Sequence, residues 1–325
     1  MVDSKKNSLK KETKIYIAGH RGMVGSAVWR TLQKKGYTNL IGRTSKELDL
    51  KNQEAVKGFY TTEKPEIVID AAAKVGGIIA NNDFPYQFLM ENMQIQNNLI
   101  DGALKSEVNK FIFLGSSCIY PKFAPQPLKE EYLLTDSLEP TNESYAIAKI
   151  TGVKACQVIR KQFHKDYVSL MPTNLYGTHD NFDLKSSHVL PAMLRKFHEA
   201  KNNNNLDVTL WGSGTPMREF LFVDDMAEAV LFALENKLPE YLYNVGSGKD
   251  ITIKELAETI QKVTGHKGQI VWDDEKPDGT PRKLMDVSKM KNIGWEYSTE
   301  LKEGIEKTYD WFLNNIDNIK EVKLH

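Results

Sequence analysis

A tyrosine and a lysine in the middle of the chain have the types and spacing that carbonyl chemistry requires. The composition of residues 143–164 predicts a helix, so Tyr145 and Lys149 project from one face of it. An ammonium group beside a phenol favours the phenolate, and we expect it to lower the pKa of Tyr145 from about 10. Ser116 follows an apolar, β-branched run at residues 110–114 that predicts a buried strand. Its hydroxyl could hydrogen-bond the same substrate oxygen.

The same spacing also occurs at Tyr60 and Lys64, so spacing alone is a weak signal. Pro65 follows that second pair and ends any helix there. The elements around the two pairs must therefore decide between them.

Composition excludes several classes of protein. The chain has 325 residues, 41% hydrophobic and 26% charged, with a formal net charge of zero. Such a chain predicts one large or two medium domains, and no basic field argues for nucleic acid or a membrane surface. Its two cysteines, Cys118 and Cys156, form no CxxC pair. A disulfide framework or a zinc site is therefore not expected, and a reducing compartment fits.

Residues 1–14 are polar and rich in lysine, without the apolar segment of a secretory signal. No apolar run reaches the ~18 residues that a membrane span needs. We expect a disordered lead-in over residues 1–12 and a cytoplasmic protein that does not enter a membrane.

A glycine-rich segment between a predicted strand (residues 14–18) and a predicted helix (residues 26–35) indicates a dinucleotide-binding loop. Glycines there permit a tight turn and close approach of the backbone to a phosphate, and the helix N-terminus offers free N–H groups. The cofactor-binding residues expected in this loop are Gly19, His20, Arg21, Gly22, Met23, Val24 and Gly25.

The end of the second predicted strand (residues 39–43) favours NADP over NAD. A cofactor without a 2′-phosphate usually meets an Asp or Glu about 20 residues after the glycines. Here Arg43 and Lys46 occupy that region and would attract a 2′-phosphate together with Arg21. The alternative is that both are solvated loop charges. Asp49 could accept a hydrogen bond from the adenine amino group.

Further strands are predicted at residues 66–71 and 167–171, with helices at 83–105 and 143–164 between them. This alternation predicts right-handed crossovers and a doubly wound parallel sheet of the Rossmann type. The carboxyl edge of such a sheet binds ligands, and Asn174 follows the last of these strands.

Beyond residue 177 the elements shorten and predict a smaller α/β lobe interleaved with the larger domain. The expected NADP-binding domain comprises residues 13–177 and 222–248, and the expected substrate lobe comprises residues 178–221 and 249–321. The helices at residues 83–105 and 145–164 could form a four-helix interface in a homodimer. A purely intramolecular core explains their apolar residues equally well.

These features occur together in the extended short-chain dehydrogenases/reductases that act on nucleotide sugars. The shared set is GxxGxxG after the first strand, a serine ending a later strand, Tyr-x-x-x-Lys and an interleaved C-terminal lobe. Within that group the chain most closely resembles the GDP-L-fucose synthases, over about residues 13–314. The segments that carry the closer resemblance are residues 18–26, 115–122, 171–177, 211–220 and 276–283.

The resemblance implies a bifunctional enzyme that uses NADPH on GDP-4-keto-6-deoxy-D-mannose. Such enzymes epimerise C3 and C5 of the sugar and then reduce the C4 ketone. Ser116 and Tyr145, the latter supported by Lys149, would stabilise the enolate oxygen. By resemblance Cys118 is the base, once its pKa falls from about 8.5, and His188 is the acid. A packed cysteine and a structural histidine are the alternatives.

The resemblance also implies binding residues for the GDP-sugar. Lys196, Trp211 and Arg218 would lie at the GDP portion, with Arg218 as a phosphate clamp and Trp211 as a platform for guanine. Asp278 would lie near nucleotide or sugar hydroxyls. The remaining cofactor-binding residues expected are Leu114, Gly115, Ser117, Lys149, Pro172, Thr173, Asn174, Leu175 and His188.

One departure from the family concerns the cofactor. Ser45, itself expected at the cofactor, stands where relatives can carry an arginine for the 2′-phosphate. That task falls to Arg21, Arg43 or Lys46, and the preference for NADP is expected to be relaxed.

Two alternatives stay open: another NAD(P)-dependent epimerase or reductase of nucleotide sugars, and a non-catalytic dinucleotide-binding sensor. A 4,6-dehydratase would want acidic residues directly after the catalytic serine, where this chain has Ser117 and Cys118.

Overall fold

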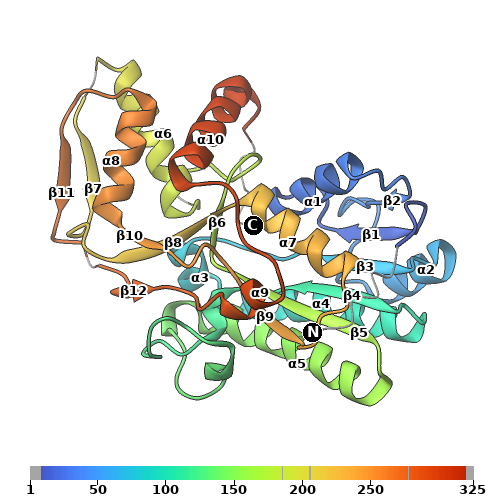
Figure 1. Ribbon diagram of the computed structural model, residues 1–325. Coiled ribbons are helices and arrows are strands. Elements are labelled where there is room, and N and C mark those ends of the chain that lie inside the picture. The colour runs from blue at the N-terminus through green and yellow to red at the C-terminus, as the bar shows by residue number, and fades with distance from the viewer. Residues whose placement is uncertain (1–8, 185, 205, 277, 320–325) are drawn as a thin grey trace.

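The centre of the molecule is a parallel sheet with strand order β2-β1-β3-β4-β5-β9 (Figure 1). The computed structural model describes residues 9–319 except 185, 205 and 277. Each neighbouring pair of strands in this sheet is parallel, which confirms the predicted Rossmann-type sheet. The strands are β1 (Ile15–Ala18), β2 (Leu40–Ile41), β3 (Ile67–Asp70), β4 (Lys110–Leu114), β5 (Asp166–Pro172) and β9 (Leu242–Val245).

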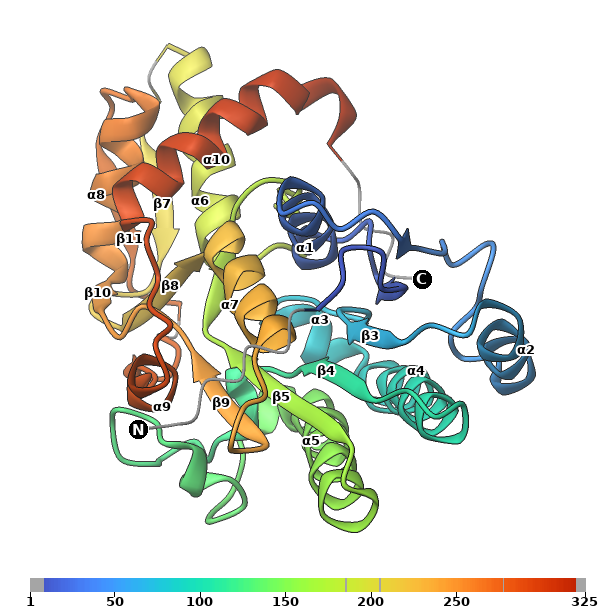
Figure 2. The same ribbon diagram turned by 45° about the vertical axis from the view of Figure 1, so that its right-hand side comes forward.

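Helices cover both faces of the sheet, so its strands are buried on both sides (Figure 2). One face carries α1 (Met23–Lys34) and α7 (Val223–Glu235). The other face carries α2 (Gln53–Glu63), α4 (Pro85–Lys105) and α5 (Glu143–Phe163). Burial on two faces explains why these strands read as continuous apolar runs rather than alternating ones.

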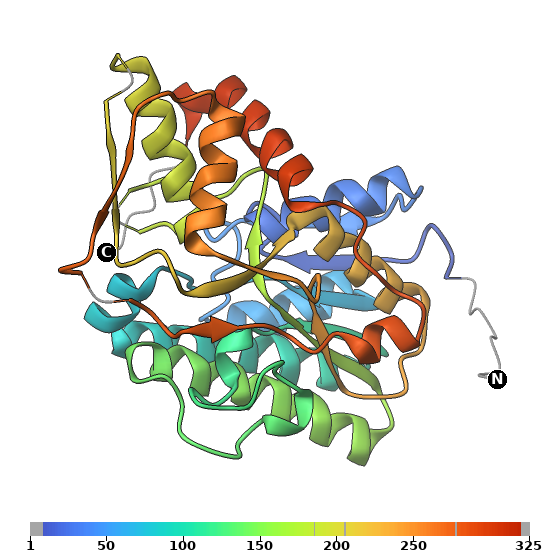
Figure 3. The same cartoon turned by 60° about the vertical axis from the view of Figure 1, so that its left-hand side comes forward.

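A second lobe packs beside the main sheet (Figure 3). Its strand β8 (Met217–Phe222) pairs with β6 (Asn174–Tyr176), β10 (Asp250–Thr252) and β12 (Arg282–Lys283). A separate pair joins β7 (Val208–Trp211) to β11 (Ile270–Asp273). The helices of this lobe include α6 (Val189–Asn202), α8 (Ile253–Thr264) and α10 (Leu301–Asn315).

Strand β8 ties the two lobes together. Its Leu221 packs in the core of the main sheet, whereas Phe220 and Phe222 pack in the core of the second lobe. The proposed domain boundaries near residues 221 and 248 stay a prediction. Short elements that the sequence did not predict are α3 (Ile78–Asp83), α9 (Ser288–Asn292), β10, β11 and β12.

The expected disordered lead-in over residues 1–12 is too long at its C-terminal end. The carbonyl of Lys11 accepts a hydrogen bond from the Thr38 N–H, the carbonyl of Glu12 accepts one from Asn39, and Leu9 packs against the core. These contacts order residues 9–12. Residues 1–8 lie outside the described residues.

Candidate active site

The loop between β1 and α1 forms a cradle that additional side-chain atoms would fill. Gly19 has a φ of +76°, and a Cβ on Gly25 would come within 2.2 Å of the Gly19 carbonyl oxygen. Helix α1 begins at Met23 after Gly22, with no side-chain cap and no acidic residue in its first turn. Its first N–H groups and the positive end of its dipole therefore suit the pyrophosphate of a dinucleotide. The glycines and this bare helix end fit the expected cofactor.

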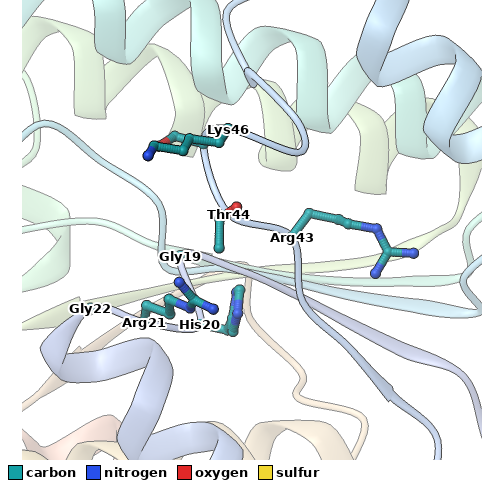
Figure 4. A pocket seen from close by; sticks show the side chains of 8 residues that line it. Gly19, His20, Arg21, Gly22, Arg43, Thr44 and Lys46 are labelled. Atoms are coloured by element: carbon teal, nitrogen blue, oxygen red, sulfur yellow. The ribbon is translucent and has the colours of Figure 1, made fainter.

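A cavity of about 340 Å³ opens over this cradle (Figure 4). It is lined by Gly19, His20, Arg21, Gly22, Arg43, Thr44, Ser45 and Lys46. Burial and the neighbouring Arg21 guanidinium lower the pKa of His20, so its ring is neutral at pH 7. The side chains of the expected residues Met23 and Val24 pack against the core, so a role of these two residues at the cofactor, which stays a prediction, would use their backbone N–H groups.

Two other residues expected at the cofactor make contacts elsewhere. The guanidinium of Arg43 bonds to a Glu63 carboxylate oxygen at 2.5 Å and points away from Thr44 and Lys46 (Figure 4). The carboxylate of Asp49 accepts a hydrogen bond from the Lys51 N–H at 3.0 Å and does not line the cavity. Their roles toward the cofactor stay predictions.

The expected Ser–Tyr–Lys residues meet at the carboxyl end of β4. Ser116 directly follows this strand, and its hydroxyl accepts from the Cys118 N–H at 3.4 Å. Lys149 on α5 is buried, and its ammonium donates to the Leu114 carbonyl at 2.9 Å. The same ammonium lies 5.9 Å from the centroid of the Tyr145 ring. The tyrosine and the lysine thus share one face of α5, as their spacing predicts.

The rival pair at Tyr60 and Lys64 is separated as expected. Helix α2 ends at Glu63, and Lys64 adopts a left-handed conformation. The Tyr60 hydroxyl is buried and donates to the Leu99 carbonyl.

The prediction that Lys149 lowers the pKa of Tyr145 is wrong. Burial raises the pKa of this phenol, and Cys118 and Asp70 raise it further. The Lys149 ammonium does not offset this rise, because it bonds to the Leu114 carbonyl rather than to the phenol. Burial also lowers the pKa of Lys149 and raises that of Asp70 to about 6, while each of these two charges stabilises the other.

Cys118 lies just after Ser116 in the short helix η1 (Ser117–Ile119) and is 7% exposed. Burial raises the pKa of its thiol, against the expected fall. The strongest opposing influence is the ammonium of Lys283, followed by the Ser116 hydrogen bond and Lys149. The thiol therefore lies in a group of cations whose effect is outweighed by burial.

His188 is the N-cap residue of α6. The residue keeps an exposed surface, yet burial among protein atoms lowers the pKa of its ring, and the Lys283 ammonium lowers it further. Protein therefore surrounds the ring on most sides while solvent still reaches it. A hydrogen bond from the Gly77 N–H to the Ser186 carbonyl, 3.2 Å long, fastens this segment to the loop after β3.

Lys283 is a site residue that sequence reasoning missed. It acts electrostatically on both Cys118 and His188, and burial lowers its own pKa. Within the described part of the chain its ammonium has no hydrogen-bond or ion-pair partner, although the side chain is half-buried. The signal that marks Lys283 is an ammonium without a partner on a half-buried side chain, and the sequence does not show that the side chain is buried.

Backbone hydrogen bonds hold the Lys283 strand beside the loop that carries Cys118. The Leu128 N–H donates to the Leu284 carbonyl at 2.7 Å, and the Met285 N–H donates to the buried Glu219 carboxylate at 2.9 Å. Asn244 accepts from the Tyr120 hydroxyl at 2.5 Å and donates to the Leu128 carbonyl at 2.8 Å. This network fixes both segments against the edge of the main sheet.

The residues expected at the GDP portion gather on the second lobe. Trp211, at the end of β7, is 59% exposed, and the Lys276 ammonium lies 5.9 Å from its ring centroid. The Asp278 carboxylate accepts from the Ser213 N–H at 3.0 Å. Burial lowers the pKa of Arg218, and the Asp278 carboxylate opposes part of this effect. An exposed tryptophan beside cations is unusual for a core residue and suits ligand stacking.

The remaining expected residues divide between the two sides of the site. Lys196 on α6 donates to the Thr209 carbonyl at 3.2 Å, and Asn174 donates to the Glu219 carbonyl at 2.8 Å. The others lie at the carboxyl ends of β4 and β5, namely Leu114, Gly115, Ser117, Pro172, Thr173 and Leu175.

Among the described residues no helix is long and apolar enough to cross a bilayer. The same residues contain no cluster of three His, Cys, Asp or Glu suited to a metal ion.

Comparison with known proteins shows the family of this chain. Residues 15–246 match the NAD dependent epimerase/dehydratase family. GDP-L-fucose synthase 1 of Arabidopsis thaliana is 56% identical over 95% of this chain and 95% of its own length. A GDP-L-fucose synthetase of Naegleria fowleri, solved with NADP, superposes with a TM-score of 0.89 at 29% identity, covering 96% of each chain. A GDP-6-OMe-4-keto-L-xylo-heptose reductase from C. jejuni superposes with a TM-score of 0.90 at 37% identity, over 94% of this chain and 99% of that one.

Proposed function

The chain belongs to the NAD dependent epimerase/dehydratase family, and we propose that within it the protein acts as an NADPH-dependent GDP-L-fucose synthase. The substrate is GDP-4-keto-6-deoxy-D-mannose, which is epimerised at C3 and C5 and then reduced at C4. The observation that carries this proposal is the position of Cys118 directly beside Ser116 at the end of β4. A simple reductase needs the serine, the tyrosine and the lysine, but it needs no second acid–base pair.

Epimerisation begins with removal of a proton from a carbon next to the ketone. Cys118 takes this proton in its thiolate form, which burial disfavours and the Lys283 and Lys149 ammonium groups favour. The resulting enolate oxygen accepts hydrogen bonds from Ser116 and Tyr145. His188 returns a proton to the opposite face of the same carbon from its imidazolium form, which burial and Lys283 disfavour. The high pKa of the buried phenol keeps Tyr145 protonated and able to donate during this step.

Reduction of the ketone uses the other part of the site. The loop at residues 19–25 would hold NADPH, which when bound would supply the hydride for C4. Tyr145 gives its proton to the C4 oxygen, and the buried Lys149 stabilises the phenolate that remains. Arg218 and Lys196 hold the diphosphate, and Trp211 stacks on the guanine base.

A direct assay tests this function. Purified protein incubated with the ketosugar and NADPH should consume NADPH and release GDP-L-fucose, identified by NMR of the product. In D₂O the product should carry deuterium at C3 and C5. NADPH consumption without such deuterium would assign a simple reductase instead. A folded, NADPH-bound protein that leaves the ketosugar unchanged would contradict the proposal.

We also propose that α4 and α5 form a four-helix interface in a homodimer. Four large apolar side chains on or beside these helices are exposed, namely Tyr86, Ile147, Val158 and Phe163. Light scattering should give the mass of two chains, and Val158→Asp should lower it to one.

Two unpaired cysteines support a reducing, cytoplasmic location, which fractionation of cells would test.

A further inference from the structure

Arg43 lines the cofactor cavity, and three contacts hold its guanidinium. Its guanidinium bonds to the Glu63 carboxylate at 2.5 Å and to the Gly42 carbonyl at 2.9 Å. The same group lies 6.0 Å from the centroid of the Phe59 ring. The ion pair is partly buried, with side-chain exposures of 35% for Arg43 and 24% for Glu63. Reorienting the arginine toward the cavity would therefore break a charge-assisted hydrogen bond that is partly shielded from solvent.

The rim of the cavity carries other charges. Lys46 lines it, and within the described part of the chain its ammonium has no ion-pair or hydrogen-bond partner. The Glu47 carboxylate accepts from the Thr44 N–H and the Thr44 hydroxyl, both at 2.7 Å. Ser45 adds no charge. Among the cations on the rim, Arg43 is thus held by a carboxylate, whereas Lys46 in the described chain is not.

We propose that the Arg43–Glu63 ion pair sets how strongly the protein discriminates NADPH from NADH, by keeping Arg43 off the 2′-phosphate. Lys46, together with Arg21, then meets the phosphate from the other side of the cavity. The inference rests on the proposed use of NADPH. Glu63 is the last residue of α2, does not line the cavity, and accepts a hydrogen bond from the Arg43 guanidinium. It is therefore a residue that determines specificity by acting through another residue.

Dissociation constants of NADPH and NADH, measured by fluorescence titration without any sugar, test this inference. Glu63→Gln keeps the shape of the side chain and removes the charge that holds Arg43. The preference ratio, which is the dissociation constant of NADH divided by that of NADPH, should rise about tenfold. The reason is that a freed guanidinium can bond to the phosphate. Glu66→Gln is the matched control, since this nearby carboxylate bonds to the Lys14 N–H. The control should leave the ratio unchanged.

A double variant tests whether Glu63→Gln acts through Arg43 or only through the loss of a negative charge. Glu63→Gln with Arg43→Gln should return the ratio to that of the unmodified protein. An unchanged ratio in Glu63→Gln would overturn the inference. So would a fall of the ratio in Arg43→Gln alone, because Arg43 would then contact the phosphate with Glu63 in place. A protein that binds neither dinucleotide would contradict the proposed function itself, and the inference with it.

Discussion

The cofactor cradle (residues 19–25) and the proposed sugar site (Ser116, Cys118, Tyr145, His188 and Lys283) are built in opposite ways. The cradle is one continuous segment whose backbone does the binding, and its glycines nearly touch. The sugar site takes its side chains from a short helix, two longer helices and strand β12. Hydrogen bonds to Glu219 and Asn244 hold the segment after β12 in place, and Asn244 also bonds to Glu130. A change in the cradle should therefore weaken NADPH binding and with it the reduction of the ketone, whereas a change in the sugar site should separate one step from another.

The largest effect is expected from Cys118→Ser. Deuterium entry at C3 and C5 in D₂O should fall by about 10²- to 10⁴-fold, because a serine hydroxyl is a far weaker base than a thiolate. Reduction of the ketone should be spared in comparison, which NADPH consumption and mass spectrometry of the product would measure. Cys156→Ala is the control, since Cys156 is a buried residue of α5 that packs in the core. Undiminished exchange in Cys118→Ser would remove this residue from the proposed role.

Gly25→Ala tests the cradle through its binding of NADPH. The added Cβ would lie 2.2 Å from the Gly19 carbonyl oxygen, so the loop must shift. A cost of about 3 kcal/mol would weaken NADPH binding about 100-fold. The matched control is Gly58→Ala in helix α2, where the Cβ meets nothing within 4 Å. NADPH affinity that stays unchanged in both variants would show that the cradle is not the binding loop.

The same contrast explains what could be predicted from the sequence. The strand, the glycines and the helix of the cradle are local patterns, and β1, α1 and the parallel sheet were predicted correctly. Lys283 was missed because its strand β12 is two residues long and is held by distant partners, Met217 and Arg218 on β8. The direction of Arg43 was equally hidden, since Glu63 lies 20 residues further along the chain.

Charge states were the least accessible property. The spacing of Tyr145 and Lys149 placed them on one helix face correctly, but it could not show that the ammonium bonds to the Leu114 carbonyl. Nor could it show the burial that raises the pKa values of Tyr145 and Cys118. Both depend on packing between elements rather than on neighbours in the chain.

Lys283→Met sharpens the contrast inside the sugar site. Because the Lys283 ammonium lowers the pKa of the Cys118 thiol against burial, its removal should raise that pKa further. Fewer thiolates at pH 7 should slow deuterium entry by on the order of tenfold, and a higher pH should restore it. The rate of Cys118 alkylation against pH, in a Cys156→Ala background, measures the shift directly. Lys283→Arg keeps the charge and should keep the profile, and an unmoved alkylation profile in Lys283→Met would contradict the assignment.

The smallest expected effect compares two buried carboxyls, one on each side of the molecule. Asp70, at the end of β3, is 1% exposed, and Lys149 moderates the rise of its pKa to about 6. Asp180, in the loop before α6, is 9% exposed, and burial raises its pKa to about 7 with no cation among the causes. Each of the two carboxylates has one oxygen without a hydrogen-bond partner in the described chain, so the cation Lys149 is what distinguishes them. Ionised Asp180 should therefore destabilise the fold more than ionised Asp70.

The sign of the pH dependence follows from the raised pKa. Protonated Asp180 stabilises the folded state fully below the unfolded pKa near about 4, and this stability is lost as the pH rises through about 7. Asp180→Asn mimics the protonated form. It should raise the free energy of unfolding on the order of 2 kcal/mol at alkaline pH and change little below pH ~4.5. Asp70→Asn should gain less, because it also removes a partner of Lys149. Urea denaturation of both variants at two pH values measures the difference, and an equal gain would show that Lys149 does not compensate Asp70.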